Sequence, residues 1–362
     1  MTAPHLTALQ NPAPAEWEQV LDPRWLATAL YPQHPDVTID DVDIVWTLSN
    51  TATKIRAKLD LTNGPKGSPA AICIKGMFGQ NAAPYRASGV SAKEVQFYQR
   101  LAGALGKTGM HLPVMLYGGI DEASGHGVLI MNDLVSEGCA FLEPLTPYNV
   151  DEAFSSVEQL ARLHAAGYQT IPLADHGWVE PMLEHIAENS LVKIERLQEL
   201  LADSRSDAFP EVMRDAQRVH GWLRLLADQW RGTPVTLVHG DVHSGNLYKL
   251  PESRGIGLID WQLIQRGCWA QDVAYHLGAA LSIEMRRAVE RDLLDHYFNY
   301  LASSGGPRIE REEGWNNYRM AMLYGYYLWA ITQRVDRPII LEFVQRLGTA
   351  VVDLDSFRLV EG

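Results

Sequence analysis

Two aspartates and one asparagine in the second half of the chain are spaced so that they could hold a metal ion and phosphate groups. Asp241 follows the apolar run 236–238, Asn246 comes five residues later, and Asp260 directly follows the apolar run 257–259. An aspartate at the end of a buried strand is costly to bury unless a cation neutralises it. Two carboxylates and an amide oxygen are hard oxygen ligands, which suit Mg²⁺ bound jointly by protein and phosphate. This pattern predicts phosphoryl transfer, in which one aspartate accepts the proton of the attacking hydroxyl.

The residues around this set resemble a known family. The matching motif is His239-Gly240-Asp241-x-His243-x-Gly245-Asn246, followed by Ile259-Asp260-Trp261-Gln262. It resembles the aminoglycoside phosphotransferase and choline kinase superfamily, and is most similar to its ecdysteroid-kinase-like bacterial phosphotransferase branch. An isolated His-Gly-Asp could equally form an ordinary polar turn, so the interpretation depends on the whole set of residues.

The resemblance implies an α+β fold of the bilobal, protein-kinase-like type. The small, β-rich N-terminal lobe would bind the nucleotide and span residues 1–131, beginning with an extension, 1–36. A hinge would follow at 132–138, and the larger helical lobe, 139–362, would carry the catalytic loop and the acceptor site. The order of expected elements agrees, because strands with one helix precede a mainly helical half.

The resemblance also implies a role for each motif residue. Asp241 would be the catalytic base, or would orient the acceptor hydroxyl, and Asn246 and Asp260 would hold Mg²⁺ on the phosphates of ATP. His239 would fix the catalytic loop through a backbone hydrogen bond. His243 would either contact substrate or phosphate or have an ordinary role in the loop. Most of the catalysis would come from positioning and charge neutralisation.

Lys75 ends the apolar run 70–75, which predicts the third strand. The resemblance pairs Lys75 with Glu94, on a helix that starts near Ser91, to hold the nucleotide phosphates. Two alternatives remain. A lysine at a strand end can simply extend to water, and Ser91-x-x-Glu94 also fits a capping box, in which the glutamate satisfies its own helix.

A polar loop, 47–53, lies between two predicted strands, 42–46 and 54–61. By resemblance this loop covers the nucleotide phosphates, with contacts from backbone N–H groups and from the hydroxyls of Ser49 and Thr51. An ordinary hairpin is the alternative.

The hinge is expected to contact the base. By resemblance the backbone of Asn132 and Leu134 would bond the adenine edge and Met131 would face the base. A flexible methionine is equally suited to core packing.

The second half is otherwise expected to be helical. His164 lies beside the apolar stripe of a helix over 150–166, which Gly167 would end, and is expected to be a hydrogen-bonded core histidine. Asp272 is placed to cap a helix over 273–281, and by resemblance it also braces the catalytic loop. Further helices are expected just before Pro32 and over 182–201, 212–230, 283–301, 312–333 and 339–354.

Composition excludes several classes of protein. The chain has 362 residues and a formal net charge of −13, and no run of Lys and Arg interrupts that balance, so no nucleic-acid partner is expected. Its three cysteines lie far apart and predict neither a disulfide framework nor a metal site. No apolar run approaches the roughly 18 residues of a membrane span, and the N-terminus lacks the features of a secretory signal. We expect a cytoplasmic protein, and its oligomeric state stays open.

Aromatic residues in the 312–333 helix bear on the substrate. They lie on two faces, one formed by positions 315, 318, 322 and 326 and the other by 320, 323, 324 and 327. If one face lines a cleft, the acceptor is a largely apolar alcohol, such as a sterol-like or hydroxyacyl compound. The alternative is that both faces pack against neighbouring helices, as aromatic stripes mostly do.

We therefore expect an ATP- and Mg²⁺-dependent kinase that acts on a hydroxyl of a small molecule. A protein kinase is disfavoured because no Ala-Pro-Glu segment or long activation loop follows Asp260. An aminoglycoside-type antibiotic phosphotransferase is the alternative within the same class. A nucleotide-binding pseudokinase that regulates a partner is less favoured, because every catalytic position is filled.

Overall fold

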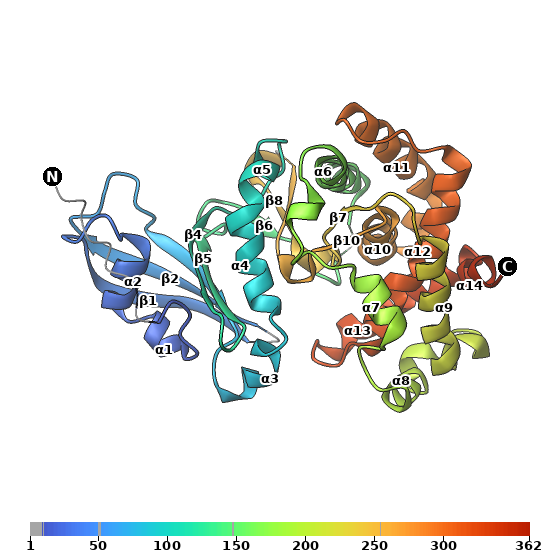
Figure 1. Ribbon diagram of the computed structural model, residues 1–362, viewed down its shortest axis with the longest axis horizontal. Helices are drawn as coiled ribbons and strands as arrows, with labels where there is room; N and C mark the ends of the chain where they lie inside the picture. The colour runs from blue at the N-terminus through green and yellow to red at the C-terminus, as the bar shows by residue number, and fades with distance from the viewer. Residues whose placement is uncertain (1–8, 10, 50–51, 147, 254) are drawn as a thin grey trace. The chain divides into compact units, whose positions relative to one another are not determined.

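The computed structural model describes residues 9, 11–49, 52–146, 148–253 and 255–362. The chain forms two compact units (Figure 1). Unit 1 comprises Met1–Gly103, Leu112–Ala140 and Asp260–Leu263, and unit 2 comprises Ala104–His111, Phe141–Ile259 and Ile264–Gly362. The segment that begins at Asp260 thus belongs to unit 1, although the residues before and after it belong to unit 2. One sheet-based unit and one largely helical unit confirm the predicted α+β class, whereas the hinge at 132–138 stays a prediction.

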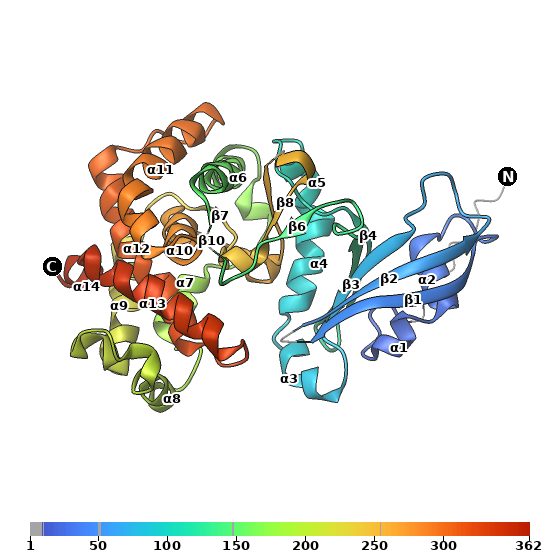
Figure 2. The ribbon, with the colours of Figure 1, turned by 180° about the vertical axis from the view of Figure 1, so that it is seen from behind.

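Unit 1 is built on one antiparallel sheet with the strand order β1-β2-β3-β5-β4, in which β1, β2 and β3 lie side by side (Figure 2). Its strands are β1 (Thr38–Ser49), β2 (Thr53–Thr62), β3 (Ala71–Gly76), β4 (Met115–Asp121) and β5 (His126–Asn132). One face is apolar and packs with Val20 and Leu26 from the N-terminal helices α1 (Trp17–Val20) and α2 (Pro23–Leu30). Because strand side chains alternate between faces, the opposite face carries Lys54 and Lys75, which are paired in register.

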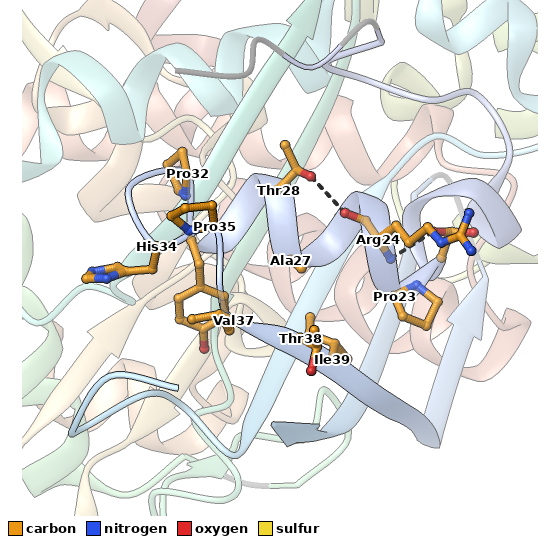
Figure 3. A pocket seen from close by; sticks show the side chains of 12 residues that line it. Pro23, Arg24, Ala27, Thr28, Pro32, His34, Pro35, Val37, Thr38 and Ile39 are labelled. Carbon is orange, nitrogen blue, oxygen red and sulfur yellow. Dashed lines mark hydrogen bonds between the residues drawn. The ribbon is translucent and has the colours of Figure 1, made fainter. Parts of the chain in front are cut away.

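The start of α2 follows its sequence signal. Asp22 accepts hydrogen bonds from the backbone N–H groups of Arg24 (2.8 Å) and Trp25 (3.2 Å), and Pro23 occupies the first turn. An open hollow of about 800 Å³ lies beside this helix and is lined by Pro35 and Val37 among others (Figure 3). It contains none of the residues predicted to act on phosphate.

Three helices follow β3 in the chain. They are α3 (Ala83–Arg86), α4 (Val90–Arg100) and α5 (Ala102–Gly106). The longest of them, α4, packs on β4 and β5 and buries Val95, Phe97 and Tyr98. The same helix positions Glu94 in the interior of unit 1.

Unit 2 is mainly helical. Its helices are α6 (Val150–Gln169), α7 (Met182–Glu188), α8 (Ile194–Leu201), α9 (Ala216–Gln229), α10 (Ala270–Ala280), α11 (Ile283–Ser303), α12 (Arg311–Ile331), α13 (Arg337–Asp353) and α14 (Ser356–Glu361). The short strands outside the five-stranded sheet form a β10-β7 pair and a β6-β8-β9 sheet. Their bounds are β6 (Ala140–Phe141), β7 (Thr236–Val238), β8 (Leu247–Lys249), β9 (Ile256–Leu258) and β10 (Gln265–Gly267). The predicted apolar runs at 236–238 and 257–259 thus correspond to β7 and, shifted by one residue, β9.

Several helix boundaries differ from the sequence prediction. The expected helix over 182–201 is two helices, α7 and α8, because the chain leaves helical conformation at Asn189. The expected helix over 212–230 begins only at Ala216, where Asp215 accepts the N–H of Arg218 at 3.1 Å. A polar capping residue thus sets the start of α9, whereas the N-cap residues of α7 and α8, Pro181 and Lys193, make no side-chain capping bond.

Gly167 was predicted to end α6, but that prediction is wrong. The helix continues to Gln169, so Gly167 lies inside it. A Cβ atom at Gly167 would lie 2.3 Å from Thr236 Oγ1 and 2.4 Å from the amide nitrogen of Leu237. This glycine therefore allows α6 to approach β7, the strand that leads to Asp241.

All the aromatic residues of α12 except Trp315 are buried, and Trp315 is half-buried and stacks on Tyr318. Tyr318, Tyr324, Tyr326 and Tyr327 have no exposed surface and Trp329 is only 4% exposed. Hence the packing alternative is correct, and the burial of both faces removes the reason to expect an aromatic cleft.

None of the helices in the described part of the chain combines the length and apolar composition needed to cross a bilayer.

We expect Gly167→Ala to lower the free energy of unfolding by about 1–3 kcal/mol, the usual cost of overpacking. Gly221→Ala in α9 is the matched control, since an added Cβ there meets only the end of the Arg224 side chain, at 4.0 Å. The control should be neutral or slightly stabilising, because alanine favours helix over glycine. Urea unfolding of both variants measures this, and equal effects would contradict the close approach of α6 to β7.

Candidate active site

Lys75 lies between two carboxylates in the interior of unit 1. Its Nζ is 2.6 Å from Glu94 Oε2 and 2.7 Å from Asp260 Oδ1, and all three residues are buried. Burial alone would lower the pKa of Lys75, but the negative charges of Asp260 and Glu94 raise it above the ordinary value for lysine. Lys75 therefore stays charged, and the predicted Lys75–Glu94 ion pair is present.

Glu94 is not part of a capping box. The helix α4 starts at Val90 with Gly89 as its N-cap, so Ser91 already lies inside the first turn. The Ser91 hydroxyl instead accepts the N–H of Gly127 at 2.9 Å, and Glu94 Oε1 accepts the N–H of Trp261 at 3.2 Å. The carboxylate of Glu94 thus links Lys75 to the segment that begins at Asp260.

Asp260 is held in an unusual backbone conformation. Its φ is +67°, a region that non-glycine residues seldom adopt. The next residue, Trp261, is fully buried and stacks on Phe97 of α4 with ring centroids 4.0 Å apart. Burial opposes ionisation of Asp260, but Lys75 and Lys54 hold its pKa well below the usual range. Stacking and ion pairing together fix a charged Asp260 in unit 1.

The predicted catalytic loop, in unit 2, is braced by one buried carboxylate. Asp272 accepts hydrogen bonds from the backbone N–H groups of His239 (2.7 Å) and Gly240 (2.9 Å), and lies 3.2 Å from His164 Nε2. His239 Nε2 in turn donates to the carbonyl of Ile259 at 2.9 Å. The predicted backbone bond of His239, the bracing by Asp272 and the core position of His164 are all present.

Asp272 is not the helix cap that the sequence suggested. The helix α10 begins at Ala270, so Asp272 lies in its first turn, and the N-cap residue Trp269 makes no side-chain capping bond. Its carboxylate instead accepts the N–H groups of His239 and Gly240, which directly follow the distant strand β7. Three-dimensional pairing rather than local helix chemistry therefore explains this residue.

Asp241 is oriented by donors to both of its carboxylate oxygens. The hydroxyl of Tyr275 lies 2.8 Å from Oδ1, and Asn246 Nδ2 lies 3.2 Å from Oδ2 and 2.8 Å from the Asp241 carbonyl. Trp329 Nε1 donates to the Tyr275 hydroxyl at 2.7 Å. Because an indole N–H only donates, the proton of Tyr275 is directed to Asp241. The Asp241 side chain remains 19% exposed, so it keeps an accessible acceptor.

Two further histidines lie beside the catalytic loop. His243 Nδ1 accepts the N–H of Gly245 at 3.1 Å, and its ring lies edge-on to Trp329 with centroids 5.3 Å apart. His276 is buried, donates from Nδ1 to the carbonyl of Val242 at 2.9 Å and accepts from the Ser156 hydroxyl at 2.6 Å. His243 thus has a role in the loop, and any contact with substrate stays a prediction.

The predicted base-contacting residues lie on β5 and the following turn. Met131 is buried, and the N–H of Asn132 donates to the carbonyl of Val114 at 3.1 Å, so this N–H is already engaged. The Leu134 carbonyl accepts the N–H of Cys139 at 2.9 Å. Asp133 forms a two-point ion pair with Arg56, at 2.8 and 2.9 Å. The roles of these residues in nucleotide binding stay predictions.

The predicted phosphate-covering loop, 47–53, is shorter than expected, because β1 continues through Ser49 and β2 begins at Thr53. Of the residues between these strands, 50–51 are outside the described residues. The hydroxyl of Ser49 lies 2.7 Å from that of Thr53, so the two ends of the loop are joined. Thr51, the other predicted contact, lies outside the described residues.

Sequence reasoning missed Lys54, Tyr275 and Trp329. Lys54 Nζ lies 3.3 Å from Asp260 Oδ2, as a second lysine on the same carboxylate. The alternation of basic residues at 54, 56 and 58 was a signal for one polar face of β2. No local pattern could reveal Tyr275 or Trp329, because their contact with Asp241 depends on the packing of α10 and α12.

The chain matches the sequence model of the phosphotransferase enzyme family over residues 81–310, which is more than half of its length. The chain belongs to this family. Its membership agrees with the resemblance seen in the motif around Asp241 and with a small-molecule kinase. The ecdysteroid-kinase-like branch within it stays a prediction.

Solved structures with the same fold include small-molecule kinases. An ethanolamine kinase of Plasmodium vivax has a TM-score of 0.50 at 13% identity, and covers 87% of this chain and 82% of its own. A choline kinase of Cryptosporidium parvum has a TM-score of 0.53 at 10% identity, with 88% of each chain covered. The GDP complex of an aminoglycoside 2'-phosphotransferase has a TM-score of 0.52 at 15% identity, with 92% and 99% covered. At these identities the likeness concerns the fold, and it agrees with the predicted kinase-like type.

Two curated relatives are longer proteins that are named as oxidoreductases or dehydrogenases. A probable acyl-CoA dehydrogenase of Arabidopsis thaliana is 31% identical over 147 residues, which is 38% of this chain and 17% of that protein. An uncharacterized oxidoreductase of Caenorhabditis elegans is 24% identical over 195 residues, 50% of this chain and 23% of that protein. The matched parts are about a fifth of each relative.

We expect His276 to make stability depend on pH. Burial lowers the pKa of His276 to about 4 from an ordinary 6.5. Between these two pH values His276 is protonated in the unfolded chain and neutral in the folded chain. The free energy of unfolding should therefore fall as the pH drops from about 6.5 towards 4, by an amount on the order of 3 kcal/mol from this group. Urea unfolding at pH 7 and pH 4.5 measures the fall.

His276→Gln is the control for this pH effect, because glutamine does not titrate. The variant should be less stable at pH 7, where two hydrogen bonds are perturbed, and its stability should depend less on pH. Parallel pH dependence in both proteins would contradict the assignment to His276.

Proposed function

We propose that the protein transfers the γ-phosphoryl group of ATP to a hydroxyl group of a small molecule. The observation that carries the proposal is the buried Lys75, charged and paired with both Glu94 and Asp260. Such a lysine next to a metal-binding aspartate is the arrangement that holds nucleotide phosphates in kinase-like sites. Family membership supports the same reaction class.

In the proposed reaction Asp241 orients the acceptor hydroxyl and accepts its proton. Hydrogen bonds from Tyr275 and Asn246 fix the plane of its carboxylate. Burial raises the pKa of Tyr275 well above its ordinary value, as does the charge of Asp241, so Tyr275 remains a donor. Because the Asp241 carboxylate is already fixed, aligning the substrate hydroxyl with the phosphoryl group costs less entropy.

Each residue assigned to the metal carries an oxygen of the kind that Mg²⁺ prefers. Asp260 offers carboxylate oxygens, and Asn246 has its amide nitrogen committed to Asp241, which leaves its oxygen for a cation. Among the residues that the structure describes, no group of three His, Cys, Asp or Glu could hold a metal. In the proposed site, phosphate oxygens would supply further ligands. When bound, the ion would neutralise charge on the phosphates.

The identity of the acceptor substrate must be decided by experiment. A largely apolar alcohol was expected from an exposed aromatic face of α12, and the burial of both faces removes that support. The fold neighbours are named for ethanolamine, choline and aminoglycosides. One relative is named as an acyl-CoA dehydrogenase. These names define a test panel rather than a substrate.

A coupled ADP- and GDP-release screen tests the proposal. The panel contains choline, ethanolamine, kanamycin, hydroxyacyl compounds and sterols, each with ATP and with GTP, and the phosphorylated product is identified by mass spectrometry. Asp241→Asn is the matched control, because asparagine can still accept from Tyr275. With the true acceptor it should keep nucleotide affinity and lose about 10²–10⁴ in kcat, the worth of a positioned base.

The screen separates the alternatives. Phosphorylation of kanamycin alone would favour the aminoglycoside-type enzyme over a kinase for an apolar alcohol. Nucleotide binding with no product from any acceptor would favour the pseudokinase. Near-full kcat in Asp241→Asn would remove Asp241 from the mechanism.

A second prediction separates the metal ligand from the base. Wild-type protein should bind ATP more tightly with Mg²⁺ than without it. In Asp260→Asn this gain should largely disappear, because a ligand carboxylate is gone, whereas Asp241→Asn should retain it. Calorimetric titration of ATP with and without Mg²⁺ measures the gain, and equal losses in both variants would show that the two roles are divided wrongly.

A further inference from the structure

We propose that Lys54 is a second phosphate-binding lysine, which with Lys75 holds the phosphate chain of the nucleotide. This inference rests on the proposed function and adds to it a residue that the motif does not contain. It concerns only groups within unit 1.

Lys54 and Lys75 are directly opposite each other on β2 and β3. Like charges at directly opposed positions of neighbouring strands repel. Here one carboxylate lies against both, with Asp260 Oδ1 2.7 Å from Lys75 and Oδ2 3.3 Å from Lys54. The ammonium groups of both lysines therefore lie against the same carboxylate. An anion at this position is needed to offset the repulsion between the two lysines.

The two lysines differ in what else holds them. Lys75 has a second carboxylate, Glu94, at 2.6 Å, and its side chain is only 6% exposed. The Lys54 side chain is 27% exposed, and Asp260 is its only carboxylate within ion-pair distance among the described residues. Lys54 is thus the cation whose single partner is also the proposed metal ligand.

This difference predicts an exchange of partners. When Asp260 binds a divalent cation, Lys54 loses its counter-charge whereas Lys75 keeps Glu94. A solvent-accessible ammonium group then gains from a new anion, and phosphate oxygens accept strong, charge-assisted hydrogen bonds from lysine. The nucleotide that carries the cation supplies those oxygens.

Charge balance in the cluster leads to the same conclusion. Two lysines and two carboxylates, Lys54, Lys75, Glu94 and Asp260, make the cluster neutral. Without Lys54 the cluster would be negative and would repel a nucleotide whose net charge is negative even with Mg²⁺. Lys54 therefore makes the surroundings of Lys75 compatible with a phosphate chain.

The neighbouring basic residues of β2 do not compete for this role. Arg56 is committed to Asp133 through two short bonds. Lys58 is exposed, and no ion pair involves it among the described residues. Since strands rise about 3.3 Å per residue, Lys58 lies about 13 Å from Lys54 along the same face. It is therefore a matched control of the same type, strand and face.

Calorimetric titration with Mg·ATP and with adenosine tests the proposal without knowledge of the acceptor. The variants are Lys54→Gln, Lys54→Arg and Lys58→Gln, with thermal unfolding as the check on folding. Lys54→Gln should weaken Mg·ATP binding about 10- to 100-fold, as expected for loss of a charged hydrogen bond, and leave adenosine binding unchanged. Lys54→Arg and Lys58→Gln should bind Mg·ATP within a few-fold of wild type.

Three outcomes would overturn the inference. Wild-type affinity of Lys54→Gln for Mg·ATP would show that Lys54 does not contact phosphate. Tighter binding would show that Lys54 only competes with the metal for Asp260. Equal losses for Mg·ATP and adenosine would assign Lys54 to the sheet rather than to phosphate. If wild-type protein binds neither compound, the proposed function fails first, and that result is distinct from the other three.

Discussion

A buried ammonium group must be matched by carboxylates, and the polar interior of unit 1 follows from that requirement. Lys75 is almost fully buried, where an isolated charge would cost several kcal/mol. Two carboxylates from different parts of the chain, Glu94 on α4 and Asp260 far along the sequence, remove that cost. The stacking of Trp261 on Phe97 keeps the second carboxylate in place. Removing any one partner would leave an uncompensated charge in the interior.

In unit 2 the structural requirement is different, because the backbone turns where the strand β7 ends and its N–H groups need hydrogen-bond acceptors. His239 and Gly240 directly follow β7, where the strand pairing has ended. The buried carboxylate of Asp272 accepts the N–H groups of both residues. Buried polar groups that are fully satisfied make a loop rigid. Asp241 and His243 differ from these groups, because their side chains keep 19% and 17% of their surface exposed. A rigid loop with one accessible carboxylate is what a positioned hydroxyl acceptor requires.

The aromatic residues of α12 show how the same side chains serve two purposes. Tyr324 and Trp329 are buried as core residues, yet Tyr324 donates to the Gly240 carbonyl at 3.1 Å and Trp329 donates to Tyr275. Their rings fill the helical core while their polar atoms reach the catalytic loop. Substitutions in this core are therefore expected to affect turnover as well as stability.

The sequence by itself determined the strands of unit 1 and predicted the functional groups of the site. Strands 42–46, 54–61 and 70–75 fell within β1, β2 and, apart from its first residue, β3, because their residue types suit a half-buried sheet. The spacing of Asp241, Asn246 and Asp260 specified oxygen ligands and a hydroxyl acceptor, because those functional groups are properties of the residues themselves.

Only the tertiary structure decided which polar groups meet. Ser91-x-x-Glu94 fitted a capping box and Asp272 a helix cap, since both signals are local. Each carboxylate instead has partners from segments far away in the chain, and a buried charge is stabilised more by such partners than by a solvated helix end. The pairing of Lys54 with Lys75 depends on strand register, and the contact of Tyr275 with Asp241 on helix packing. Neither is encoded at any fixed spacing, because both depend on where the chain returns in space.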